Sequence, residues 1–162
     1  MKSLLLVRHA KSGWDNPLLQ DHDRPLDARG HKDAPMMAKR LLDKGVSIDL
    51  FISSTALRAL TTAKYFQEAF SAKSEQLIEM QSLYHADVPV FYKTIANIAD
   101  GCKTAAIFSH NPGITYMANT FGVASVDDMP TCALFAIKAN VEHWKDFETA
   151  EKQFWFFDYP KL

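Results

Sequence analysis

A cation and an imidazole near the start of the chain are the groups best placed to do chemistry. Arg8 and His9 directly follow residues 4–7, a short apolar run typical of a buried strand. Ligands of open α/β sheets bind at the carboxyl ends of the strands, and a strand that stops here delivers both side chains to that edge. A nucleophilic imidazole beside a permanent cation indicates chemistry on an anion such as a phosphoryl group.

Two later strand ends present similar groups. The strand expected at residues 49–53 leads into a helix with Arg58 in its first turn, and the strand expected at 104–109 runs into His110. In a parallel sheet these ends lie at one edge, so the two side chains can converge on the first pair. Helix N-termini there add unpaired N–H groups and the positive end of a dipole, which favour a bound anion.

Strands and helices that alternate along the chain must position these residues. The apolar runs predict six strands, at residues 3–7, 49–53, 76–80, 104–109, 133–138 and 152–157. Helical spacing of apolar residues predicts helices at residues 33–44, 56–70 and 89–99. Because Pro35 suits a first turn, the first of these helices could start near His31, or start earlier and kink. Ser54 or Thr55 is the expected N-cap of the second helix. A fourth helix is expected to open with Asn111 as N-cap and Pro112 at its first position, and to end at Gly122.

This alternation predicts an α/β fold, a three-layer α/β/α sandwich with a mostly parallel central sheet. The last two strands have no long helix between them, so an antiparallel pair is possible there. The aromatic residues 154–157 predict a strand packed on both faces, with a dimer contact as the alternative. Residues 1–162 are expected to form a single domain.

Bulk composition narrows the class of protein. The 162 residues are 48% apolar and carry 18 basic and 19 acidic side chains, a net charge of -1. A balanced charge predicts neither a nucleic-acid partner nor attachment to an anionic membrane. The apolar run before Arg8 is too short for a signal peptide, and we expect a cytoplasmic protein. Cys102 and Cys132 have no metal-binding or redox spacing and are expected to be reduced thiols.

The three strand-end motifs together resemble the histidine phosphatase superfamily, also called phosphoglycerate-mutase-like. The motifs are Arg8-His9-Ala10, residues 54–63 and Ser109-His110-Asn111-Pro112. Within the superfamily the chain is most similar to the SixA-type phosphohistidine phosphatases. The segments specific to that group are residues 8–14, Asp23-Arg24-Pro25-Leu26 and Ala28-Arg29-Gly30.

The resemblance implies a role for each of four residues. His9 would be the nucleophile that becomes phosphorylated, Arg8 and Arg58 would bind the phosphoryl oxygens, and His110 would donate to the phosphoryl group in the transition state. Elementary chemistry agrees, because guanidinium forks match phosphate oxygens and phosphoryl transfer depends mainly on positioning and charge stabilisation. These side chains already supply positive charge, so no metal or other cofactor is expected.

The general acid is where the chain departs from the family pattern. Superfamily members that cleave phosphate esters usually carry a glutamate after the third strand, whereas residues 83–87 contain none. His85 stands at the matching position with Asp87 close by. Either could donate a proton, or they could be a loop histidine and a helix cap. Imidazole is a weaker base than an alkoxide and leaves with less help, so this site suits a phosphoramidate.

The sequence therefore predicts a metal-independent phosphatase whose substrate is a phosphorylated histidine-containing protein. The alternatives are a small-molecule phosphomonoesterase or mutase of the same fold, and a non-catalytic module that binds phosphorylated ligands. Arg24 could lie near the pocket mouth or only form salt bridges with the local aspartates, and Lys11 could reach the phosphate or line the entrance. Arg29 is expected to be structural. Residues 21–23 are expected to be a solvated loop.

Overall fold

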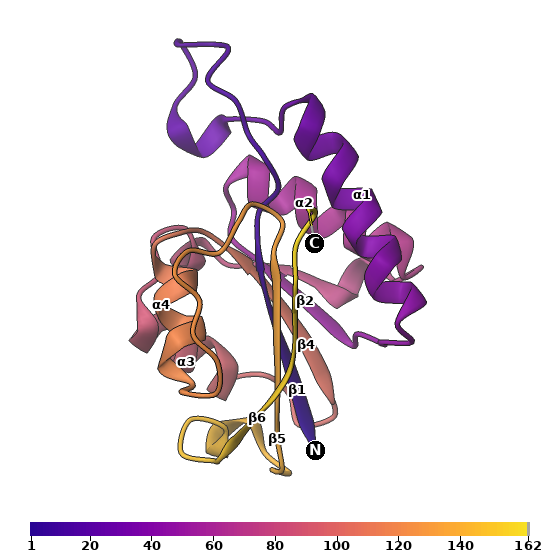
Figure 1. The fold of residues 1–162 in the computed structure, drawn as a ribbon, viewed down its shortest axis with the longest axis vertical. Coiled ribbons are helices and arrows are strands. Elements are labelled where there is room, and N and C mark those ends of the chain that lie inside the picture. The colour runs from indigo at the N-terminus through magenta and orange to yellow at the C-terminus, as the bar shows by residue number, and fades with distance from the viewer. Residues whose placement is uncertain (162) are drawn as a thin grey trace.

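A six-stranded β-sheet forms the centre of the structure, a computed structural model that describes residues 1–161 (Figure 1). The strands lie in the order β3-β2-β4-β1-β5-β6. Their bounds are β1 (Lys2–Arg8), β2 (Leu50–Ser53), β3 (Leu77–Glu79), β4 (Thr104–Ser109), β5 (Leu134–Ala139) and β6 (Lys152–Asp158). The first four strands run parallel, while β5 is antiparallel to β1 and β6 is antiparallel to β5. The predicted mostly parallel sheet with a final antiparallel pair is confirmed.

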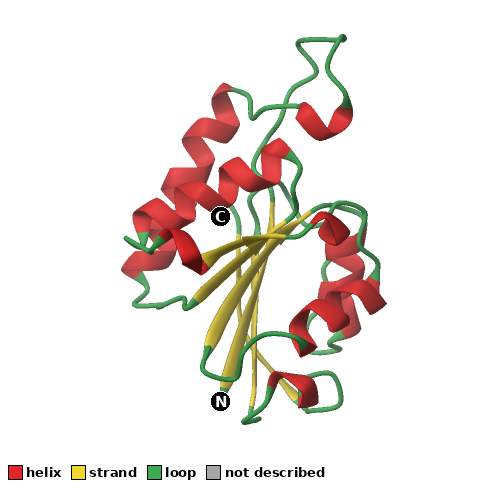
Figure 2. Ribbon diagram, turned by 180° about the vertical axis from the view of Figure 1, so that it is seen from behind, coloured by secondary structure: helices red, strands yellow, loops and turns green. Residues whose placement is uncertain are grey.

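Four helices cover the two faces of this sheet (Figure 2). They are α1 (Ala28–Asp43), α2 (Leu57–Ala69), α3 (Val88–Ala96) and α4 (Gly113–Thr120). The apolar side chains of β1 alternate between the faces, as the two-residue period of a strand requires. Leu5 and Val7 pack with α1 and α2, and Leu4 and Leu6 pack with α3 and α4. This arrangement confirms the predicted three-layer sandwich. No helix within residues 1–161 is long and apolar enough to cross a membrane.

The first helix begins at Ala28, so of the two starts left open for it, near His31 or earlier, the earlier start is the one observed. Asp27 caps it by accepting a hydrogen bond from the Gly30 N–H at 2.8 Å, and Pro35 then lies inside the helix. A proline there removes one intrahelical hydrogen bond. The cap, together with the buried face that Ala34, Met37 and their neighbours provide, offsets that loss.

Two predicted caps are wrong, because tertiary contacts use the side chains differently. Ala56 is the N-cap of α2. The Ser54 hydroxyl lies before the helix and accepts a hydrogen bond from the Ala56 N–H. Pro112 is the N-cap of α4. The Asn111 side chain instead donates to Asp128 at 2.6 Å and to the backbone carbonyl of residue 129 at 3.1 Å.

The aromatic run lies on β6, at the edge of the sheet. Trp155 and Phe156 pack on the α1/α2 face and Phe157 packs on the other, which confirms contacts on both faces. An irregularity opposite Ala136 and Ile137 leaves Trp155 without a paired residue, and this places two consecutive aromatic side chains on one face. Phe154 remains 45% exposed, because no strand lies beyond β6 among the described residues.

The start of α1 rests directly on the segment that follows β1. A Cβ atom on Gly30 would lie 2.1 Å from the backbone oxygen of Lys11, which also accepts a hydrogen bond from the Asp27 N–H at 3.0 Å. Gly30→Ala should therefore lower the free energy of unfolding by about 2 kcal/mol and Tm by about 4–8 °C, measured by thermal and denaturant unfolding.

Gly101→Ala is the matched control, because a Cβ atom there meets nothing within 4 Å. A Tm of Gly30→Ala equal to that of Gly101→Ala would contradict the close packing of α1 on the Lys11 backbone.

Candidate active site

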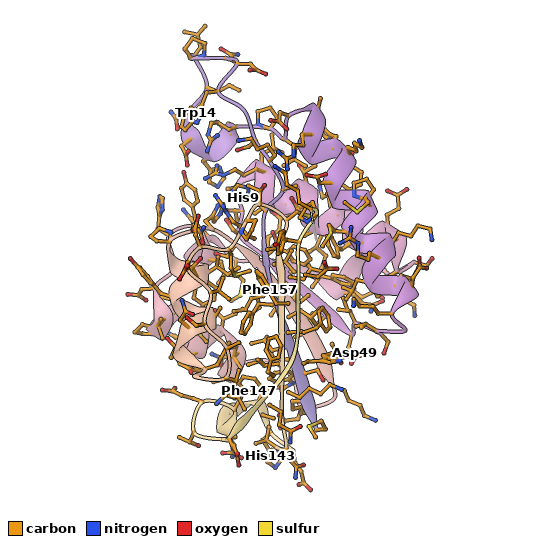
Figure 3. The ribbon with its side chains drawn as sticks, in the orientation of Figure 1. His9, Trp14, Asp49, His143, Phe147 and Phe157 are labelled. Carbon is orange, nitrogen blue, oxygen red and sulfur yellow. The ribbon has the colours of Figure 1, made fainter. Side chains whose placement is uncertain are left out.

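The ends of three neighbouring parallel strands place the predicted residues together. Arg8 at the end of β1 is paired with Ser109 at the end of β4, so the next residues, His9 and His110, are also neighbours. Their ring centroids lie 5.1 Å apart. Figure 3 shows His9 at this edge of the sheet, below the projecting segment that carries Trp14.

These side chains line a cavity of about 260 Å³. The lining includes all four residues of the predicted constellation, together with Lys11, Ser12, Trp14, Arg24, Asn111 and Thr131. Three arginines and one lysine line this cavity, and its lining contains no carboxylate. Clustered cations in a cleft attract anions and raise their local concentration. The chemistry of the lining therefore fits a small, multiply charged anion. Within residues 1–161 no group of three or more His, Cys, Asp or Glu side chains could hold a metal ion.

His9 is held as a neutral imidazole. The residue is only 7% exposed, and its Nδ1 lies 2.7 Å from the backbone oxygen of Ala10. Because a carbonyl can only accept, Nδ1 carries the proton and Nε2 keeps its lone pair. Burial lowers the pKa of His9 to about 3, with the charges of Arg58 and Arg8 acting in the same direction. A neutral imidazole with a free Nε2 is a competent nucleophile near pH 7.

His110 is neutral for similar reasons. Burial lowers its pKa to about 2, and the neighbouring His9 and Arg58 contribute further. Its Nε2 lies 2.8 Å from the Ser54 hydroxyl, which fixes the ring. Its Nδ1 is buried and has no hydrogen-bond partner among the described residues, and the same is true of the Nε atoms of Arg8 and Arg58. An unpartnered buried polar atom is costly, so these three nitrogen atoms carry a desolvation cost that the described residues do not offset.

Asp21 organises one wall of the cavity. Its carboxylate accepts hydrogen bonds from Arg58 Nη2 at 3.0 Å, from Arg24 Nε at 3.0 Å and from the Tyr84 hydroxyl. Its backbone oxygen accepts a further bond from Arg58 Nη1 at 2.7 Å. Burial opposes the charged form, but the bonds from Tyr84 and Arg58 outweigh it and hold the pKa of Asp21 well below its usual range.

The expectation that residues 21–23 form only a solvated loop is therefore wrong for Asp21. They form a 3-10 turn, and the Asp21 carboxylate is 39% exposed. Of the three residues that donate to the Asp21 carboxylate, only Arg24 is close to it in the sequence, three residues later. The fold alone brings Arg58 and Tyr84 to the same carboxylate.

Arg24 both forms a salt bridge with a local aspartate and lies at the pocket, the two alternatives left open for it. It pairs with Asp21 and also lines the cavity, where its guanidinium lies 3.6 Å from the centre of the exposed Trp14 ring and donates to Ser12 at 2.9 Å. Lys11 is exposed and lines the cavity mouth. Arg29 pairs with Asp33 along α1, as expected for a structural residue.

His85 and Asp87 lie outside the cavity that holds His9. They line an adjoining cavity of about 190 Å³ that shares His110 and Asn111 with the first. Asp87 is the N-cap of α3 and accepts the Val90 N–H at 3.2 Å, so its expected capping function is confirmed. His85 is exposed, and its ring lies 4.0 Å from that of Tyr84. The general-acid role of either residue stays a prediction.

The fold and the strand-end constellation together define a class of protein. A profile of the histidine phosphatase superfamily (branch 1) matches residues 4–87, and the chain belongs to this superfamily. An uncharacterized chloroplastic protein of Arabidopsis thaliana is 30% identical over 160 residues, which cover 90% of this chain and 70% of that protein.

Two solved structures share the phosphoglycerate-mutase-like fold, each with a TM-score of 0.81. One is the protein histidine phosphatase SixA complexed with tungstate, which is 20% identical, with 98% of this chain and 97% of that chain covered. The other is a candidate phosphohistidine phosphatase SixA from Agrobacterium tumefaciens, which is 23% identical, with 98% of both chains covered. At these identities the likeness establishes the fold.

The buried His9 should remain neutral far below the ordinary histidine range. We expect NMR of ring-labelled protein to show a neutral His9 down to about pH 4, because the pKa is lowered from 6.5 to about 3. The unfolded chain takes up this proton near 6.5, so stability is present above that pH and is lost as pH falls. His9→Asn should remove about 2 kcal/mol of the stability change between pH 7 and pH 5. A His9 titration near 6.5 would contradict the neutral, buried imidazole.

Removing the charge of Asp21 should weaken the wall that it organises. Asp21→Asn should lower the free energy of unfolding by about 1 kcal/mol, because charge-assisted bonds from Arg58 and Arg24 are lost at a partly exposed site. Denaturant unfolding measures this change. Asp23→Asn is the control, since Asp23 is exposed and lies 3.6 Å from His22 in its only ion pair among the described residues. Equal effects of the two substitutions would show that Asp21 has no special structural role.

Proposed function

We propose that this chain is a phosphatase that forms a covalent phosphoryl intermediate on His9 and that acts on phosphohistidine in a protein. The observation that carries the proposal is a neutral, buried imidazole with a free Nε2 inside a cavity lined by three guanidinium groups. Membership of the histidine phosphatase superfamily supports the same chemistry.

The reaction would have two steps on the same nitrogen. His9 Nε2 attacks phosphorus, forming an N–P bond while the bond from phosphorus to the leaving group breaks. Water then attacks the phosphorylated His9, the N–P bond breaks, and inorganic phosphate is released. Two steps through a covalent intermediate replace one harder step. Arg8 and Arg58 would bind the phosphoryl oxygens throughout, because phosphoryl transfer depends on positioning and on stabilising charge.

His110 would be charged as an imidazolium only when the phosphoryl group is bound. Without that anion its imidazole is neutral, with a pKa lowered by burial and by neighbouring cations. A phosphoryl dianion beside it favours the charged imidazolium and raises that pKa. His110, which lines the cavity, would then donate to a phosphoryl oxygen. The anion would thereby convert His110 into an acid.

The absence of a glutamate from residues 83–87 favours a leaving group that needs little protonation. By the family resemblance, residues 83–87 correspond to the segment in which ester-cleaving members usually carry a glutamate. Here that segment contains an exposed His85 and the helix cap Asp87. A phosphohistidine needs less protonation of its leaving group than an alkoxide does. A small-molecule phosphomonoesterase or mutase remains the second candidate, favoured by the position of His85 beside the cavity that contains His110. Faster turnover of small phosphate esters than of a phosphohistidine protein would select it.

Labelled phosphoryl transfer tests the covalent step. Incubation with a labelled phosphodonor and an alkaline quench should trap an acid-labile, alkali-stable phosphoryl group on His9. His9→Ala should lose this group and lose turnover by on the order of 1,000-fold or more. His143→Ala is the control, since Figure 3 shows His143 at the opposite end of the sheet. No label on the wild type, with phosphate still bound, would leave a non-catalytic module that binds phosphorylated ligands.

A further inference from the structure

A second cavity adjoins the cavity that contains His9, and the two differ in the chemistry of their linings. The first is lined by cations and other polar groups, whereas the second presents a mostly apolar wall. Its volume is about 190 Å³, and it shares His110 and Asn111 with the first. A substrate whose phosphoryl group lies against His110 in the first cavity could therefore extend into the second without leaving the protein surface.

Flat side chains form the walls of this second cavity. The rings of Tyr84 and His85 lie 4.0 Å apart, and the Tyr84 ring meets His110 edge-on at 5.5 Å. The Tyr84 hydroxyl donates to Asp21, the same carboxylate that holds Arg58. The aromatic wall and the phosphate-binding guanidinium are thus fixed relative to each other by one acceptor.

The other side of the second cavity is formed by the start of α4. Pro112 and Tyr116 line it, and the Tyr116 side chain is 63% exposed. A Cβ atom on Gly113 would lie 2.0 Å from the backbone oxygen of Ala86, so α4 begins in direct contact with the segment that carries His85. This close approach keeps the two aromatic sides at a fixed separation.

We propose that the second cavity is a leaving-group pocket that takes a planar heteroaromatic ring, the imidazole of phosphohistidine. The proposal rests on the proposed function, because the phosphoryl group attached to that ring must occupy the first cavity. Aromatic rings favour stacked or edge-on contacts with other rings. A polyol such as a sugar would place several hydroxyl groups against a mostly apolar wall and would find partners only at the few polar side chains that line it, which is costly. The pocket therefore selects for a ring on the leaving side of phosphorus.

Two phosphoramidates that differ only in the ring make the test. Phosphoimidazole and phosphoramidate both have a P–N bond to cleave, but only the first has a ring to place in the leaving-group pocket. Tyr116→Ala should lower the ratio of kcat/KM for phosphoimidazole to that for phosphoramidate by about 5- to 10-fold. Tyr116→Phe keeps the ring and should keep the ratio. Tyr65→Ala, whose tyrosine contacts His31 on α1, is the matched control and should also keep it.

The outcomes separate the two proposals. An unchanged ratio in Tyr116→Ala, or an equal fall in Tyr65→Ala, overturns the leaving-group pocket while His9-dependent turnover of phosphoramidate still supports the phosphatase. If the wild type cleaves neither compound and His9 takes no label, both proposals are wrong. A fall in the ratio for phenyl phosphate relative to glycerol phosphate, with no fall for phosphoimidazole, would assign the pocket to another kind of ring and overturn the imidazole proposal.

Discussion

Parallel pairing of β4 with β1 on one side and β2 on the other is the constraint on which the site depends. It aligns three carboxyl ends at one edge, where Arg8 ends β1, His9 and His110 directly follow β1 and β4, and Arg58 lies in the first turn of α2. The apolar alternation of β1 then requires helices on both faces, and these helices fix the loops around the edge. The chemistry of the cavity is thus a consequence of strand direction as much as of residue type.

The cations at this edge of the sheet lie close together, and very few acidic groups balance their charge. Like charges disfavour one another, and a buried guanidinium without a partner is costly. Asp21 is the acidic partner of two of the guanidinium groups, since it forms ion pairs with both Arg24 and Arg58. The histidines adapt differently, because burial among cations keeps both rings neutral. The cavity therefore combines permanent positive charge with neutral imidazoles, a combination that favours a bound anion.

The two adjoining cavities differ in charge and shape. One is lined by guanidinium groups, and the other has flat, mostly apolar walls. His110 and Asn111 belong to both, and Asp21 links Arg58 of the first cavity to the aromatic Tyr84 of the second. Under the proposed function, these shared residues would couple the position of the phosphoryl group to that of its leaving group.

Local sequence determined most of the architecture and the four side chains gathered at the sheet edge. Apolar runs and helical spacing report directly which face of an element is buried, so the strands and helices were predictable. The helix caps were less predictable, because the Asn111 and Ser54 side chains form hydrogen bonds with residues distant in the sequence. Asp21 and the cavity beside Tyr84 were decided only by tertiary structure. A carboxylate among exposed neighbours looks solvated until the fold brings Arg58, far along the chain, within hydrogen-bonding distance.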